Sequence, residues 1–481
     1  MAPRGLNVTT NVIVYVIIRI VNIKASLFSW ALIPCAEQYF ASHINYGFYQ
    51  SRCSADEYIC LNADSKSTSV LGLRLLQSYV PLRTDRSANV SASSIYIRSR
   101  TLVSMINRNL PLNYVRRIEM SEKLRVGILG GTGMVGQRFI ALLENHPWFE
   151  VVTIAASPRS AGKTYAEAVG DRWKMDTPMP EAVKNIIVHN VNEVEEVAST
   201  VDFVFSAVDM SKDEIKAIEE AYAKAETPVV SNNSAHRWTP DVPMMVPEIN
   251  PQHAKVIEYQ KKRLGTTKGF VAVKPNCSIQ SYAPVLTAWK EFEPQEVVVT
   301  TYQAISGAGK TFKDWPEMVG NIIPFIGGEE EKSEQEPLRL WGEIVDGKIE
   351  KCTDGPKITS QCIRVPVLNG HTAAVFVNFK KKPTKEELID RMVKFSGEPQ
   401  ELGLPSAPKQ FIQYLEEDNR PQVSLDVDYE NGMGISIGRL REDSIFDYKF
   451  VGLSHNTVRG AAGGAVLCAE LLKAKGYITK K

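Results

Sequence analysis

Cys277 stands at a position where a cysteine can act as a nucleophile. It follows an apolar segment, residues 270–273, that is predicted to form a strand, and it directly precedes a segment that is predicted to form a helix. A thiol at the N-terminus of a helix faces the positive end of the helix dipole and unpaired N–H groups, which favour a thiolate and can bind an oxyanion. The alternative is a small buried side chain, as most lone cysteines are. The apolar face of the predicted helix comprises Ile279, Tyr282, Ala283, Leu286 and Trp289.

A glycine-rich run predicts that the chain also binds a dinucleotide. A predicted strand over 125–129 leads directly into the run, and an amphipathic helix follows it. Gly130 permits a tight turn, Gly133 lets backbone N–H groups approach a pyrophosphate, and Gly136 allows the helix to pack closely on the strand. A glycine-rich turn without a ligand is the alternative. The predicted cofactor-binding residues of this run are Gly130, Thr132, Gly133, Met134 and Val135.

The end of the next predicted strand, residues 151–156, indicates which dinucleotide is bound. Enzymes that use a cofactor without the 2′-phosphate usually place an acidic residue there, and this chain has none. Ser157, Arg159 and Ser160 instead offer two hydroxyl groups and a guanidinium group, which suit the 2′-phosphate of NADP. The alternative is a solvated loop that happens to be basic.

Strands and helices alternate from residue 120 onward, which is typical of an α/β fold with a parallel sheet. We predict a Rossmann-like NADP-binding domain over 120–270, completed by residues 455–481, where a long helix opens at Asn456 and returns to this domain. Residues 271–454 are predicted to form an α+β catalytic and dimerisation domain with a mixed or antiparallel sheet. The predicted strands beyond those already named are residues 201–206, 228–231, 297–303, 363–366, 373–379 and 435–440.

Composition excludes several classes of protein. The 481 residues carry 56 basic and 55 acidic side chains, a net charge of +1 that gives no electrostatic basis for nucleic-acid binding. Seven cysteines, an odd number, argue against a disulfide scaffold and for a reducing compartment such as the cytoplasm. Cys352, Cys362 and Cys468 lack the setting of Cys277 and are predicted to be structural. No CxxC pair or HExxH motif is present, so no metal site is expected.

Residues 1–119 differ in kind from the rest because they are basic and rich in serine. Their apolar stretch is interrupted by Arg19, Asn22 and Lys24, so no membrane span is expected. Two interpretations stay open: a mitochondrial transit peptide, or an extension that is non-native or mispredicted.

Six motifs in series resemble the aspartate-β-semialdehyde dehydrogenase family, in its fungal or archaeal branch, and the resemblance covers residues 120–481 in order. The motifs are Gly130 to Gly136, Ser231-Asn232-Asn233-Ser234-Ala235-His236-Arg237, Pro275-Asn276-Cys277-Ser278, Tyr302-Gln303-Ala304-Ile305-Ser306-Gly307-Ala308-Gly309, Arg364-Val365-Pro366-Val367 and Gly370-His371. The resemblance implies the NADPH-dependent conversion of L-4-aspartyl phosphate to L-aspartate 4-semialdehyde, on the route to lysine, threonine and methionine. It also implies a homodimer or homotetramer.

The resemblance further implies three catalytic residues. Cys277 would attack the acyl phosphate and form a thioacyl enzyme, and Gln303 would orient the substrate. His371 would be the acid/base group, because an unperturbed imidazole pKa of about 6.5 lets it exchange protons at physiological pH. A histidine that merely satisfies a loop is the alternative for His371.

Five further residues would bind the substrate or the cofactor. Arg364, seven residues before His371, would grip the α-carboxylate of the substrate with its planar fork. Arg237 and Lys332 would bind the phosphate, and Glu329 would bind the substrate amine. Asn456 resembles the family residue that meets the nicotinamide amide.

Three competing functions share some of these features. N-acetylglutamyl phosphate reductases and glyceraldehyde-phosphate dehydrogenases have a similar glycine loop, cysteine and histidine, but they account less well for Arg364 and the Gln303 motif. A non-catalytic NADP sensor would have no reason to keep cysteine, glutamine, arginine and histidine together.

Overall fold

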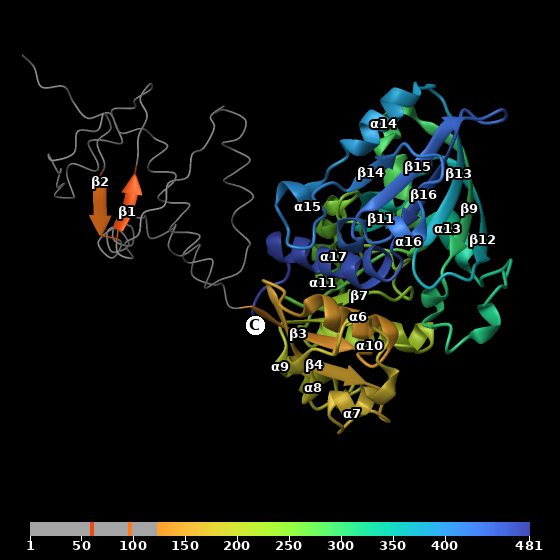
Figure 1. Cartoon of the computed structure of the whole chain (residues 1–481). Helices are drawn as coiled ribbons and strands as arrows, with labels where there is room; N and C mark the ends of the chain where they lie inside the picture. The colour runs from red at the N-terminus through yellow and green to blue at the C-terminus, as the bar shows by residue number, and fades with distance from the viewer. Residues whose placement is uncertain (1–57, 62–94, 99–122) are drawn as a thin grey trace, which may run out of the picture. The chain divides into compact units, whose positions relative to one another are not determined.

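The computed structural model describes residues 58–61, 95–98 and 123–481, and the rest of the predicted extension lies outside the described residues. Strands β1 (Tyr58–Leu61) and β2 (Ile95–Arg98) form an antiparallel pair with Tyr58 opposite Arg98. Residues from 122 onward form a separate compact unit (Figure 1). Within the described residues, no helix is long and apolar enough to span a bilayer.

The first sheet of this unit is six-stranded and entirely parallel, in the order β5-β4-β3-β6-β7-β8. Its helices lie on both faces, because alternate residues of each strand point to opposite sides. Phe203 and Phe205 share a core with α6 and α17, whereas Val204 and Val229 share a second core with α9 and α10. The Rossmann-like prediction is thereby confirmed. The strands are β3 (Leu124–Leu129), β4 (Phe149–Ala156), β5 (His189–Asn190), β6 (Phe203–Ser206), β7 (Val229–Ser231) and β8 (Val271–Val273).

The second sheet is mixed, one of the two predicted arrangements, in the order β12-β9-β13-β16-β15-β14. It has six strands, and β14 and β16 are not among the four that were predicted. β12 pairs with β9 in parallel and β14 with β15 in parallel, while the other pairs are antiparallel. One face packs on α12 and α14, and residues of β13 alternate between buried and partly exposed, so the opposite face is only partly covered. The strands are β9 (Pro294–Gln303), β12 (Lys357–Arg364), β13 (His371–Phe379), β14 (Ile412–Leu415), β15 (Ile435–Glu442) and β16 (Tyr448–Ser454); β10 (Glu343–Val345) and β11 (Lys348–Glu350) form a separate hairpin.

Two α-helices matter most for the site and the core: α13 carries site residues, and α17 completes the core of the first sheet. α13 begins at Glu329, and the last helix, α17, is buried from Gly463 to Leu472 against the first sheet. The helices are α6 (Met134–Leu143), α7 (Tyr165–Val169), α8 (Glu181–Lys184), α9 (Val194–Thr200), α10 (Lys212–Lys224), α11 (Ile257–Leu264), α12 (Ala283–Ala288), α13 (Glu329–Leu340), α14 (Lys385–Val393), α15 (Glu398–Glu401), α16 (Val423–Asp426) and α17 (Gly463–Ala474).

The continuous helix predicted after Cys277 is wrong. A 3₁₀ turn, Ser278–Ser281, ends at Tyr282, whose φ of −144° is not helical, and α12 starts afresh at Ala283. Pro284 explains the break, because proline has no N–H with which to continue a helix but fits its first turn. The predicted apolar face is nevertheless correct, since all five of its residues are buried.

The helix predicted to open at Asn456 also begins later. Residues Val458–Ala462 form a π-helical turn that contains a non-helical residue, Ala461, and α17 starts at Gly463. π-Helical turns are rare and are often found at functional sites, where they redirect a side chain. Arg459 lies in this turn and is fully buried.

Candidate active site

Cys277 and His371 lie together at the edge where the two sheets meet. Cys277 follows β8 of the first sheet, and His371 is the first residue of β13 in the second. The Cys277 Sγ lies 3.4 Å from His371 Nε2. The Ala304 N–H donates to His371 Nδ1 over 3.1 Å, so in the neutral ring the proton resides on Nε2, facing the sulfur.

Burial decides the charge of both groups. It lowers the pKa of His371 to about 3, with the nearby charge of Arg364 acting in the same direction. It raises the pKa of the Cys277 thiol, as does the carboxylate of Glu329. The expectations of an unperturbed imidazole and of a thiolate favoured by a long helix are therefore wrong, because desolvation outweighs both. The resting pair is a neutral imidazole beside a neutral thiol.

Arg364 ends β12 next to this pair. Its Nη1 donates to the Ala304 carbonyl over 2.6 Å, and burial lowers its pKa without discharging it. A Cβ built on Gly307 would lie 3.1 Å from Arg364 Nη1 and 3.2 Å from His371 Cε1, so the glycine lets the backbone pack closely on both side chains. A guanidinium that donates to one backbone carbonyl retains further N–H donors, with which it can bind a carboxylate.

The Glu329 carboxylate bonds to three polar side chains. Its Oε2 accepts hydrogen bonds from Asn276 Nδ2 at 2.8 Å and Gln303 Nε2 at 3.4 Å, and its Oε1 pairs with Lys332 at 2.8 Å. Burial opposes its ionisation, but Lys332 and Asn276 outweigh burial and lower the pKa of Glu329. The E-x-x-K spacing of the sequence thus forms an ion pair in the first turn of α13, with a carboxylate directed toward the Gln303 amide.

A cavity of about 280 Å³ lies beside the first two turns of α13. Arg237 and Lys332 both line it, and Arg237 is held by Glu336 at 2.9 Å and by the Lys274 carbonyl. Two cations beside one cavity of this size can accommodate a phosphate group.

The glycine-rich turn has the geometry of an anion site. Gly130 has a φ of +81°, and a Cβ on Gly136 would come within 2.3 Å of the Gly130 carbonyl oxygen, so both positions require glycine. No side chain caps the N-terminus of α6 at Gly133, which leaves its first N–H groups available. Thr132, Met134 and Val135 all belong to this turn or to the first turn of α6.

The remaining predicted cofactor residues lie apart from one another in the chain. Ser157 and Arg159 are exposed beyond the end of β4, whereas Ser160 is buried and its N–H donates to the Ser157 carbonyl. Asn456 accepts from the Gly370 N–H and donates to Ser306 Oγ, each at 2.8 Å. The Asn456 side chain therefore supports the loop before His371.

Sequence reasoning missed Asn276, Glu336 and Lys274 as parts of this site. Asn276 binds Glu329 and also accepts from the Ser278 N–H, so it fixes the turn around Cys277. Glu336 binds Arg237 and the Asn276 N–H. Helical spacing could have identified Glu336. Lys332 and Glu336 follow Glu329 by three and seven residues on α13, so all three lie on one face of the helix.

Comparisons with known proteins agree with this arrangement. Residues 125–257 match a family model described as "Semialdehyde dehydrogenase, NAD binding domain", and residues 284–459 match "Semialdehyde dehydrogenase, dimerisation domain". Aspartate-semialdehyde dehydrogenase of Methanothermobacter thermautotrophicus is 43% identical over 352 residues, covering 73% of this chain and 99% of the relative. The Aspergillus fumigatus enzyme of the same name is 42% identical over 364 residues, covering 74% and 99%.

A solved structure gives the same answer. The crystal structure of aspartate semialdehyde dehydrogenase with NADP from Candida albicans matches with a TM-score of 0.67 and 38% identity, covering 74% of this chain and 100% of that one. The sequence is more than 40% identical to curated relatives along nearly their whole length. The fold matches that of an enzyme with the same name. The chain belongs to the aspartate-semialdehyde dehydrogenase family of oxidoreductases.

Proposed function

We propose that this enzyme catalyses the NADPH-dependent reductive dephosphorylation of L-4-aspartyl phosphate to L-aspartate 4-semialdehyde, on the route to lysine, threonine and methionine. The observation that carries the proposal is the Cys277–His371 pair, with Sγ 3.4 Å from Nε2 and the Arg364 guanidinium beside it. A nucleophile, a proton-bearing imidazole and a carboxylate-binding fork are the groups that this reaction requires.

Cys277 performs the first chemical step. Its sulfur attacks the acyl carbon of the substrate, and the bond from that carbon to the phosphate oxygen breaks. The thiol proton ends on the departing phosphate, and a thioacyl group remains on Sγ. Arg237 and Lys332 bind the phosphate in the cavity that both line. Glu329 binds the substrate amine, and Gln303 orients the acyl group between Glu329 and the sulfur.

His371 acts on the oxygen of the acyl carbon. Its Nε2–H donates to the negative charge that develops on this oxygen, shares its proton with the hemithioacetal oxygen and takes that proton back as the aldehyde forms. When that hemithioacetal collapses, the carbon–sulfur bond breaks, the aldehyde leaves and the sulfur is regenerated. The fixed bond from the Ala304 N–H keeps the Nε2 proton on the side of the sulfur.

NADPH fits the edge of the first sheet. When bound, it supplies the hydride that reduces the thioacyl group. The uncapped N-terminus of α6 at Gly133 suits the pyrophosphate, and Ser157, Arg159 and Ser160 suit the 2′-phosphate. The presence of NADP in the Candida albicans structure supports this choice. Asn456 holds the loop of His371 and contacts the nicotinamide amide.

The wider organisation follows the same reasoning. Residues 120–270 with 455–481 bind NADP, and residues 271–454 catalyse the reaction and form a homodimer or homotetramer through the partly covered face of the second sheet. The compartment is the cytoplasm, or the mitochondrion if residues 1–119 act as a transit peptide.

Arg364→Lys is expected to raise the KM for L-aspartate 4-semialdehyde by about tenfold or more, because a point charge cannot replace a bidentate fork. Initial-rate measurements with each substrate varied in turn give both KM values, and the KM for NADP should stay within about twofold. Equal increases in the two KM values would remove Arg364 from the substrate site.

The function itself is tested in the phosphorolytic direction. NADPH absorbance is followed with NADP, phosphate and one of three aldehydes: L-aspartate 4-semialdehyde, glyceraldehyde 3-phosphate or N-acetylglutamate semialdehyde. Phosphate-dependent NADP reduction with only the first aldehyde is expected. Activity with another aldehyde would reassign the substrate, and no activity despite NADP binding would indicate a sensor.

A further inference from the structure

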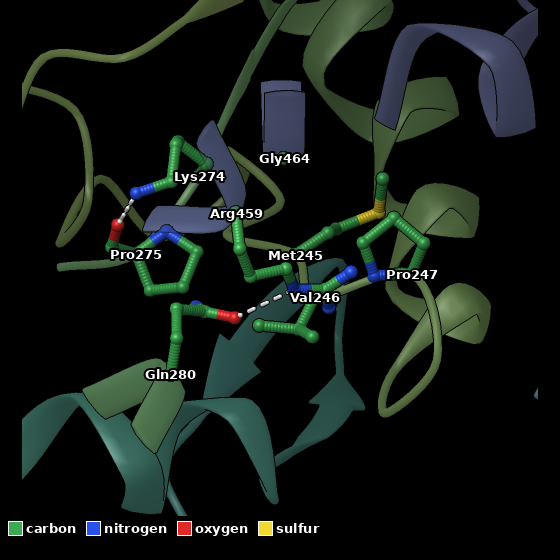
Figure 2. Close-up of a pocket in the computed structure, with 8 residues that line it drawn as sticks. All are labelled: Met245, Val246, Pro247, Lys274, Pro275, Gln280, Arg459 and Gly464. Atoms are coloured by element: carbon green, nitrogen blue, oxygen red, sulfur yellow. Dashed lines mark hydrogen bonds between the residues drawn. The ribbon is translucent and has the colours of Figure 1, made fainter. Parts of the chain in front are cut away.

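Lys274 is a buried lysine at the foot of the catalytic turn. It follows β8 directly, is only 2% exposed, and its Nζ donates to the carbonyl oxygens of Pro275 and Gly460. Figure 2 shows the Lys274 nitrogen directed at the Pro275 carbonyl. No carboxylate of the described residues lies within ion-pair distance of this nitrogen. A buried ammonium without a counter-ion is costly, so its position calls for a partner.

The neighbouring charges are already matched to one another. Arg459 binds both oxygens of Glu248, at 2.8 and 2.6 Å, and its Nε donates to Gln280, a contact also visible in Figure 2. Arg237 is matched by Glu336 at 2.9 Å. Arg459 and Arg237 are thus each paired with a buried carboxylate, and these two carboxylates form no ion pair with Lys274.

Water can solvate this charge only sparingly. The cavity beside Lys274 has a volume of about 10 Å³, which is room for at most one water molecule. Met245, Val246 and Pro247 close it on the side away from the turn (Figure 2). The main balance for the Lys274 charge is therefore expected from the protein itself.

Cys277 lies on the other side of the Gly460 backbone from this lysine. Gly460, whose carbonyl accepts from Lys274, packs directly on the cysteine: a Cβ built on Gly460 would lie 2.7 Å from Cys277 Cβ. One backbone contact thus separates the lysine nitrogen from the residue that carries the thiol.

We propose that Lys274 is a positioning residue whose positive charge balances the Cys277 thiolate. When the S–H bond breaks and one proton is held on Nζ, a neutral thiol and a neutral amine become a thiolate and an ammonium, so the buried pair stays neutral overall. The proposal rests on the proposed role of Cys277 as nucleophile. It explains how a thiol that burial keeps protonated becomes reactive although its histidine is a weak base.

The titration of Lys274 agrees with this role. Burial, with Arg237 acting in the same direction, lowers the pKa of Lys274 to about 7, so amine and ammonium are both accessible at neutral pH. The charges that face the two groups come from several elements. Lys274 faces Arg237, Glu336 and Arg459, and Cys277 faces Arg237, Glu329, Arg364 and His371.

The test is the pH dependence of Cys277 alkylation in the full chain without substrate or cofactor. Lys274→Gln keeps a donor toward the carbonyls but removes the charge, and Lys274→Met also removes the donor. Both are expected to raise the midpoint of iodoacetamide alkylation by about one pH unit or more, because an opposite charge is lost. Lys274→Arg retains a charge and should return the midpoint toward the wild-type value. Mass spectrometry of the Cys277 peptide identifies the labelled thiol.

Lys475→Met is the matched control, because Lys475 pairs with Glu398 far along the chain and should leave the midpoint unchanged. An unchanged midpoint in folded Lys274→Gln would overturn the proposal, whatever Lys274→Met does. Since alkylation needs no turnover, failure of the semialdehyde assay would not alter this readout, and the two hypotheses fail separately.

Discussion

Cys277→Ser is expected to lower kcat by about a thousandfold or more while the Kd for NADPH stays unchanged. A serine hydroxyl remains protonated at neutral pH, and an oxygen ester accepts hydride far less readily than a thioester. The thiol lies in the turn between β8 and α12, whereas the predicted cofactor residues belong to the turns after β3 and β4, so the two properties should separate. Phosphate-dependent NADP reduction gives kcat, and NADPH fluorescence titration gives Kd.

Cys352→Ser is the matched control for this variant. Cys352 contacts the Asp354 carboxylate in an exposed setting and is not part of the site, so its replacement should retain full activity. Full activity in Cys277→Ser would remove the thioacyl intermediate from the mechanism. Loss of NADPH binding in the same variant would mean that the turn had collapsed, and circular dichroism would detect it.

His371→Gln is expected to lower kcat by about a hundredfold to ten-thousandfold, since general acid–base catalysis contributes this much. Glutamine can still donate a hydrogen bond toward the sulfur but cannot pass on a proton. Because the pKa of His371 is about 3, its protonation does not shape the rate profile near neutrality. The variant's profile between about pH 6 and 8 should therefore be lower in height but unchanged in shape.

The control for His371→Gln is His236→Gln. The ring of His236 contacts Thr239 Oγ1 at 3.0 Å and lies in no part of the proposed chemistry. If the rate of the wild-type enzyme changed with pH around pH 6.5 and this change were absent in His371→Gln, the low pKa of His371 would be contradicted. A wild-type kcat in His371→Gln would contradict the catalytic role.

Local signals made the first sheet predictable from sequence. The strand, the glycine run and the amphipathic helix around Gly130 to Gly136 are encoded by consecutive residues, and the structure has them within one residue of the prediction. The second sheet was harder. β12 starts at Lys357, six residues before the predicted start. The first five residues of this strand are exposed or only partly buried, so they carry little of the apolar signal from which a strand is predicted.

The chemistry of the site was only partly predictable. The spacing of Glu329 and Lys332 anticipated their ion pair, because residues three apart on a helix face each other. Lys274 could not be recognised, since its acceptor on Gly460 lies 186 residues away in sequence. The pKa of His371 was misjudged for the same reason: burial arises from distant segments, and a sequence does not display it.

The position of α17 in the chain has a consequence for how the molecule is made. This helix is synthesised after every strand of the second sheet, yet it completes one face of the sheet that begins with β3. The apolar side chains on that face, Phe203 and Phe205 among them, therefore lack this covering until α17 has been translated. A nascent chain that stalls before Gly463 exposes this surface, so it depends on chaperones at that stage and is prone to aggregate.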